Sequence, residues 1–256
     1  MLFSTARILE HSIAAQNDER MRQERVANIK GASSPVRRGI ARVALNFATN
    51  RPDQASNLLD GIARLRGLEY VGTGIEYTVY RERSTDEAIK IHRESADMTP
   101  NAQVELLAQV KTNGSILGVY LGGAAVEQSV EIGPHVFGGY NTVQVRQPFQ
   151  HFTDADAPFT VNQPEVDLPK LETLVRNHPG APDALREFIE RSRQMHYDAA
   201  LLPDTNGRHN VIVDTDDNVV LIDTTPIATD IAYLARTRDN IMSQLYSLEI
   251  GLSEVA

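Results

Sequence analysis

The sequence predicts an α+β fold in two lobes, because runs typical of strands are gathered in one region and helical patterns dominate the next. Three runs rich in Val, Ile and Tyr fall within residues 68–92, and two more fall within 125–149, with one helical segment between them. From residue 170 onward the pattern is helical except for one hairpin. This grouping differs from the strand–helix alternation that builds a parallel sheet.

Composition narrows the class of protein. A chain of 256 residues suits one large domain or two modest ones. A net charge of −9 makes nucleic acid an unlikely partner. The absence of cysteine excludes disulfides, Cys-bound zinc and thiol nucleophiles. No apolar run is long enough to span a bilayer, and the first residues lack the pattern of a signal peptide, so we expect a cytoplasmic protein without membrane contact.

Residues 1–67 predict an N-terminal helical extension. Residues 3–30 contain neither Pro nor Gly and predict one polar helix, and 35–50 predict a second that begins with Pro35 in its first turn. Residues 51–67 predict a third, ended by a glycine. The first 70 residues hold 11 basic and 7 acidic side chains, a net charge of +4, which leaves −13 on the remainder. We interpret this region as a solvated helical surface rather than a patch for an acidic partner.

Residues 68–150 predict a lobe built on an antiparallel sheet. Gly72 and Gly74 lie between the first two strands, where glycines let backbone N–H groups approach phosphate oxygens, although two glycines are also ordinary hairpin chemistry. Lys90 stands between two isoleucines in the third strand, which is unusual unless its face is polar or its charge has a partner. Glu105, on the helix predicted over 101–114, is placed to be that partner.

Residues 151–256 predict a mainly helical lobe. Residues 151–169 are rich in Pro and Asp and predict a linker, and helices follow over 170–180 and 183–201. A hairpin comes next, and a final helical stretch covers roughly 227–254.

The hairpin places two oxygen-bearing side chains together. The stretch "GRHNVIVDTDDNVVLID", residues 207–223, has two apolar runs around an acidic turn. Because a hairpin brings the open ends of its strands together, Asn210 and Asp223 are expected to lie near each other. An amide oxygen and a carboxylate are hard ligands that suit Mg²⁺. Asp204 precedes the hairpin and is placed to reach toward whatever the metal holds.

Taken in order, these features resemble the protein-kinase-like superfamily, which includes small-molecule and antibiotic kinases. A Gly-rich turn precedes a strand "AIK" that ends at Lys90, and a helix with a Glu follows. Later, a loop with Asp204 and Asn210 precedes a hairpin that ends in Asp223, and the interval of 13 residues from Asn210 to Asp223 matches the usual family spacing. The resemblance covers about residues 68–226.

The resemblance implies a bilobal kinase-like fold, with the helical extension over 1–67, an N-lobe over 68–150 and a reduced C-lobe over 151–256. It implies a phosphotransferase that uses ATP and Mg²⁺ and transfers a phosphoryl group to a hydroxyl acceptor, either a small molecule or a protein. Backbone groups around 144–152 would contact adenine. The implied side-chain roles are phosphate cover for Gly72 and Gly74, phosphate contact for Lys90 held by Glu105, Mg²⁺ binding for Asn210 and Asp223, and proton acceptance for Asp204.

The chain departs from the protein-kinase pattern. The H-R-D triplet is "LPD", five residues instead of four separate Asp204 from Asn210, and D-F-G is "DTT". No A-P-E motif follows, and 33 residues remain after Asp223. These departures fit a small-molecule kinase, a divergent bacterial branch or an inactive relative.

Three alternatives stay open. The first is a kinase-like module that binds nucleotide or a partner without catalysis, and the second is an enzyme of the same fold that transfers AMP. The third is an α+β interaction protein with a polar hairpin and no nucleotide. If Asp204 is not the base, Asp198 is the next candidate.

Overall fold

The computed structural model describes residues 64, 67–74, 76–134, 141–160, 163–207 and 209–255, and the three helices expected within 1–67 lie outside these residues, except for Arg64. The chain divides into two compact units, each described here by itself. Unit 1 comprises the described residues up to Thr112 together with Gln128–Phe149. Unit 2 comprises Asn113–Glu127 and the described residues from Gln150 onward.

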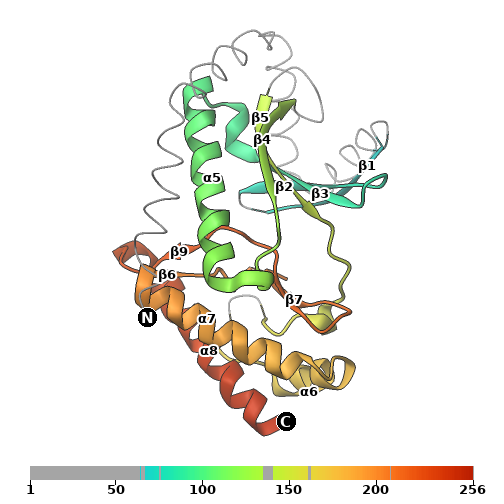
Figure 1. Ribbon diagram of the computed structural model, residues 1–256, viewed down its shortest axis with the longest axis vertical. Coiled ribbons are helices and arrows are strands. Elements are labelled where there is room, and N and C mark those ends of the chain that lie inside the picture. The colour runs from blue at the N-terminus through green and yellow to red at the C-terminus, as the bar shows by residue number, and fades with distance from the viewer. Residues whose placement is uncertain are drawn as a thin grey trace. The chain divides into compact units, whose positions relative to one another are not determined.

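Unit 1 is built on a five-stranded sheet in which every neighbouring pair is antiparallel (Figure 1). The spatial order is β1-β2-β3-β5-β4, so only the β3–β5 neighbours are not consecutive strands. The expected α+β class and all five expected strands are therefore confirmed. The strands are β1 (Leu68–Thr73), β2 (Tyr77–Glu82), β3 (Glu87–His92), β4 (Ser129–Pro134) and β5 (Asn141–Pro148).

One face of this sheet is covered by the first part of helix α5 (Pro100–Leu121). Leu107 and Val110 of α5 pack with Val143 and Val145 of β5 in one apolar cluster. The helix is eight residues longer than the expected segment, and its part beyond Thr112 belongs to unit 2. The opposite sheet face has its own cluster around Tyr80.

Unit 2 is mainly helical. Helices α6 (Leu168–Asn177), α7 (Ala181–Ala199) and α8 (Ala235–Val255) pack around one apolar core together with the end of α5. The amphipathic sequences of α6 and α7 explain this arrangement, because their apolar residues recur at helical spacing along one side. The fully buried side chains at the centre include Leu117, Leu174, Leu185, Leu245 and Leu248.

Two small antiparallel pairs complete unit 2. The expected hairpin is present as β7 (Val211–Val213) and β8 (Val219–Leu221), and all six of its strand residues are buried. The second pair joins β6 (Leu201–Leu202) to β9 (Ile227–Ala228). The expected helix over 227–254 therefore begins later, at Ala235 after a short 3-10 helix, because its first residues are used by a strand pair that no local pattern announces.

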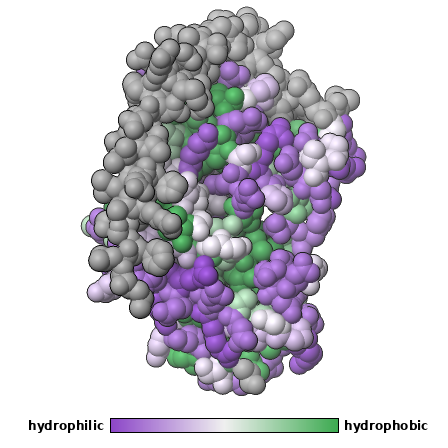
Figure 2. Space-filling model, viewed as in Figure 1, coloured by the Kyte–Doolittle hydropathy of each residue, from purple (hydrophilic) through white to green (hydrophobic). Residues whose placement is uncertain are grey.

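Polar residues predominate on the described surface that faces the viewer in Figure 2. The most exposed large side chains with apolar character are Tyr197 and Tyr233, at 88% and 83%. Within the described ranges, no helix combines the length and apolar character needed to cross a membrane.

Candidate functional site

The segment between β6 and β7, which we call loop 204–210, has its shape set by its own polar side chains. Asp204 Oδ1 accepts a hydrogen bond from the backbone N–H of Asn206 at 2.9 Å, which is the local bond that Asp favours at turns. Asn210 Nδ2 donates to the backbone oxygen of Asp204 at 3.0 Å. The two polar residues expected in this segment are therefore connected directly, and each is partly buried.

Loop 204–210 needs a glycine at position 207, because the Asn210 side chain lies directly against the backbone there. A Cβ atom at this position would overlap the side-chain carboxamide of Asn210. Only glycine lets the carboxamide lie against the backbone in this way. Because Asn210 Nδ2 is engaged by Asp204, Oδ1 is the atom of this amide that suits a cation.

The hairpin brings Asp223 to the same end as Asn210. The backbone N–H of Ile222 donates to the oxygen of Asn210 at 2.7 Å, which places Asn210 opposite the residue that precedes Asp223. Asp223 Oδ1 accepts from the N–H of Thr225 at 3.0 Å, so the "DTT" sequence makes a local turn after β8. This backbone pairing is consistent with the expectation that Asn210 and Asp223 lie near each other at the open end of the hairpin.

Asp204 is electrostatically coupled to this end of the hairpin. Burial raises the pKa of the Asp204 carboxyl, the N–H of Asn206 opposes that effect, and the negative charge of Asp223 adds to the rise. The net pKa lies above the ordinary value of 3.8. A partly buried carboxyl with a raised pKa is better suited to accept a proton than an ordinary surface Asp.

In unit 1, Lys90 lies on the sheet face that α5 covers. It pairs with Val79 of β2 and Val145 of β5, and Val145 belongs to the apolar cluster that includes α5. Residues paired across antiparallel strands point to the same face. Lys90 is only 9% exposed, and its neighbours Ile89 and Ile91 are buried in the cluster on the opposite face.

Glu105 lies on α5 but on a different side of the helix from the residues that face the sheet. Leu107 and Val110 are buried against the sheet, whereas Glu105 is exposed. On an ideal helix, a residue two positions before Leu107 points about 160° away from it. The ion pair between Glu105 and Lys90 stays a prediction.

Gly72 lies within β1, paired with Val79 of β2, and Gly74 lies in the β1–β2 connection. The register between these strands shifts at Tyr70 and Gly72, and the N–H of Gly74 donates to the oxygen of Tyr77 at 2.8 Å. No described atom lies within 4 Å of a Cβ built on Gly72, and only a backbone oxygen lies that close at Gly74. The packing of the described residues does not explain these two glycines.

Two histidines near the hairpin were not singled out by the sequence. His209, beside Asn210, contacts the Asp154 carboxylate through Nε2 and packs on Phe152 with ring centroids 4.8 Å apart. Its φ of 61° is left-handed, which is uncommon outside glycine. The partner residues lie more than 50 positions away, so local patterns could not identify this contact.

His178 joins three separate segments. Its Nδ1 lies 3.1 Å from Asp217 Oδ1 in the hairpin turn, and its Nε2 lies 3.1 Å from Asp156 Oδ1 in the segment before α6. Burial raises the pKa of Asp156, but hydrogen bonds from Thr153 and His178 outweigh that effect, so the net pKa is lowered. This cluster fixes the turn end of the hairpin, opposite the end that carries Asn210 and Asp223.

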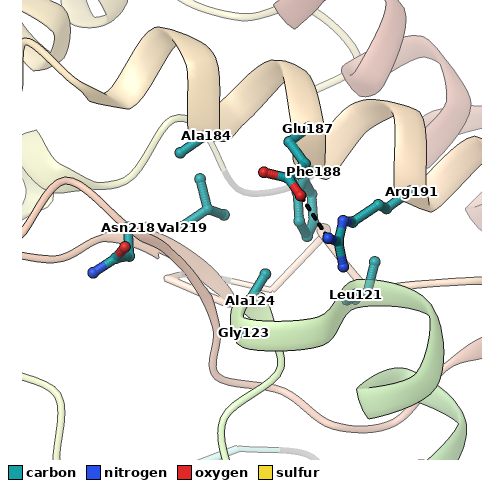
Figure 3. A pocket seen from close by; sticks show the side chains of 9 residues that line it. All are labelled: Leu121, Gly123, Ala124, Ala184, Glu187, Phe188, Arg191, Asn218 and Val219. Atoms are coloured by element: carbon teal, nitrogen blue, oxygen red, sulfur yellow. Dashed lines mark ion pairs between the residues drawn. The ribbon is translucent and has the colours of Figure 1, made fainter.

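A small pocket also lies at the turn end of the hairpin, where Asn218 and Val219 meet α7 and the end of α5 (Figure 3). Its volume is about 170 Å³. Ligand pockets generally exceed about 300 Å³, so this one is too small for a nucleotide. Its rim carries the ion pair between Arg191 and Glu187, 2.5 Å long, and none of the expected site residues lines it.

The oxygen ligands of Asn210 and Asp223 suit a metal ion that also binds substrate phosphates better than an ion held by protein side chains alone. Among the described residues, no group of three or more His, Asp or Glu side chains is arranged to hold a metal ion. Mg²⁺ is usually held by one or two carboxylates together with substrate phosphates. Asn210 Oδ1 and Asp223 fit that pattern of hard oxygen ligands.

The chain matches no protein-family model, and no curated protein matches it.

Proposed function

We propose that this chain is an ATP- and Mg²⁺-dependent phosphotransferase of the protein-kinase-like superfamily that acts on a hydroxyl acceptor. The observation that carries the proposal is the geometry of loop 204–210. The loop holds Asp204 and Asn210 by a direct hydrogen bond and ends at a hairpin whose other strand leads to Asp223. An acid with a raised pKa beside two hard oxygen ligands is the combination that phosphoryl transfer needs.

The context of Lys90 supports the same proposal. In kinases the lysine that contacts the phosphates stands on the third strand of an antiparallel sheet, followed by a helix. Lys90 is on β3, on the sheet face covered by α5, the helix that follows. A bilobal kinase-like fold is part of this proposal.

In the proposed reaction, the acceptor O–H attacks the γ-phosphorus of ATP. A new O–P bond forms, the bond between the γ-phosphorus and the bridging β–γ oxygen breaks, and ADP leaves with the electron pair. Asp204 accepts the proton of the hydroxyl, and Lys90 offsets negative charge on the phosphates. When bound with the nucleotide, Mg²⁺ supplies further charge neutralisation, and Asn210 and Asp223 would hold it.

Nucleotide binding and turnover test separate parts of the proposal. We expect Mg²⁺·ATP, but not Mg²⁺ alone, to raise the melting temperature, because the two protein ligands need the phosphates to complete the ion's shell. Lys90→Met keeps the buried stem and removes the ammonium, and should weaken ATP binding by about 10- to 100-fold. The exposed Lys111→Ala is the matched control in unit 1. Unchanged ATP affinity in Lys90→Met would overturn the phosphate-contact role.

The two carboxylates should give different results. Asp223→Asn should remove the Mg²⁺ dependence of ATP binding, whereas Asp216→Asn, at the exposed turn of the same hairpin, should not. Asp204→Asn should keep ATP affinity and lower turnover by about 10²- to 10⁴-fold, the range for loss of a general base. If Asp204→Asn retains full turnover, Asp198 becomes the next residue to test. Product masses would distinguish added phosphate from added AMP.

A second candidate function is a kinase-like nucleotide-binding or interaction module without catalysis. The "LPD" and "DTT" departures from the kinase motifs favour it. Binding of Mg²⁺·ATP without ATP consumption would support this candidate, and absence of nucleotide binding would support an interaction protein instead.

A further inference from the structure

Loop 204–210 is joined to helix α8 by buried side chains that no sequence motif suggested. Thr205 is 1% exposed and donates from Oγ1 to Gln244 Oε1 at 2.5 Å. Gln244 is fully buried, and its Nε2 donates to the backbone oxygen of Gln163 at 2.8 Å. One amide on α8 therefore connects the loop to the segment that precedes α6.

The orientation of this amide is determined by its partners. A backbone carbonyl only accepts, so the Gln244 atom that faces Gln163 must be the NH₂ group. Oε1 then faces Thr205, whose hydroxyl must donate to it. Because both ends of the amide are engaged in a buried environment, loss of either partner leaves an unsatisfied polar group.

A second contact lies one helical turn earlier. Asn240 Nδ2 donates to Asn206 Oδ1, and residues 240 and 244 stand on the same side of α8 because they are four positions apart. The helix itself is anchored by Ile241 and Leu245, which are fully buried in the core of unit 2. A rigid element thus holds two consecutive residues of the loop.

These two residues directly follow Asp204. The N–H of Asn206 donates to Asp204 Oδ1, so the residue that Asn240 holds also orients the carboxylate. A rotation of the Thr205 backbone would move Asp204 and its carbonyl, which is the acceptor for Asn210. A displacement of about 1 Å at a reacting group is enough to lower a rate by about 100-fold.

We propose that Gln244, acting through Thr205, is the positioning residue that fixes Asp204 for proton acceptance. The inference rests on the proposed phosphotransferase function and adds α8 to its machinery. A positioning role differs from a general structural one, because it predicts a loss of kcat with little change in the KM for ATP. It also predicts rescue by any side chain that restores the hydroxyl.

The test uses the full chain with Mg²⁺·ATP as the probe and its hydrolysis as the readout, so no acceptor needs to be known. Thr205→Val is nearly isosteric and removes the hydroxyl, Thr205→Ser restores it, and Gln244→Met removes the amide. Ser243→Ala, at the exposed neighbouring position of α8, is the control. We expect kcat to fall by about 10- to 100-fold in Thr205→Val and Gln244→Met, with KM changed by less than about threefold. Thr205→Ser should keep most of the wild-type kcat.

Amide hydrogen exchange of residues 204–207 supplies a readout that does not need turnover. Thr205→Val and Gln244→Met should accelerate exchange in this segment, whereas Ser243→Ala should not. Absence of Mg²⁺·ATP binding by the wild type would overturn the proposed function. The amide exchange rates of the variants would then still show whether α8 stabilises loop 204–210. Wild-type hydrolysis with unchanged kcat and exchange in both variants would overturn the positioning role alone. An equal loss of kcat in Thr205→Ser would also overturn it.

Discussion

Replacement of Gly207 by Ala tests the geometry of loop 204–210 without changing any ligand. A Cβ at this position occupies the space of the Asn210 carboxamide, so the side chain must leave its place and give up its bond to the Asp204 oxygen. Gly123 offers a matched control in the same unit. No described atom lies within 4 Å of a Cβ built there, so Ala should be accommodated.

The magnitude follows from three effects. Loss of the hydrogen bond lowers the free energy of unfolding by about 0.5–1.5 kcal/mol. Displacement of packed atoms lowers it by about 1–3 kcal/mol, and the reduced backbone freedom of the unfolded chain restores about 0.4–1 kcal/mol. We therefore expect Gly207→Ala to destabilise the protein by about 2 kcal/mol. Gly123→Ala should be neutral or stabilise it by less than about 1 kcal/mol.

Urea unfolding followed by far-UV circular dichroism measures this difference, since the chain has eight Tyr and no Trp for fluorescence. Equal m-values in wild type and variants would show that the same surface is exposed on unfolding. The Mg²⁺ dependence of ATP binding is the second readout, and it should weaken in Gly207→Ala because Asn210 Oδ1 moves. A Gly207→Ala protein within about 0.5 kcal/mol of wild type, with unaltered Mg²⁺ dependence, would refute the close packing of the carboxamide on the loop.

Three further predictions concern charged contacts in unit 2. His178→Ala leaves the carboxylates of Asp156 and Asp217 without the imidazole that contacts both, and should lower the free energy of unfolding by about 2 kcal/mol in urea. In the folded state the pKa of Asp156 is lowered. The contribution of this carboxylate to stability is therefore complete above its unfolded pKa and is lost as pH falls through its folded pKa. Below about pH 4, the free energy of unfolding of Asp156→Asn should therefore change less steeply with pH than that of the wild type. Arg193→Gln breaks the paired contacts with Glu249, at 2.9 and 2.6 Å, and should cost less than about 1 kcal/mol, a difference that shrinks in 1 M salt.

The parts of the fold that local chemistry determines were predicted from the sequence. Asp214 illustrates this, because its Oδ1 accepts from the N–H groups of Asp216 and Asn218 at 2.9 Å and so builds the hairpin turn within five residues. The β-rich runs of unit 1 were equally clear, since their side chains alternate across a sheet. The β6–β9 pair was not foreseen, because two strands of two residues carry no period and their paired residues are 25 and 27 positions apart.

The candidate site divides in the same way. Asn210 and Asp223 were expected together because a hairpin joins them. Gln244 of α8 contacts Thr205 from 39 positions away, and in a helix it looks like an ordinary surface residue until its burial is known. The role expected for Glu105 stays a prediction, since sequence order places it on α5 but does not determine its partner.

Each unit is made of two separate stretches of the chain, and this interleaving limits how the protein can be divided into fragments. Residues 113–127 contribute Leu117 and Leu121 to the core of unit 2, although they lie between two parts of unit 1. A fragment that starts at Gln150 would lack these side chains and expose the apolar surface that they cover. Isolated expression of unit 2 therefore calls for a circular permutant or a grafted helix rather than a simple truncation.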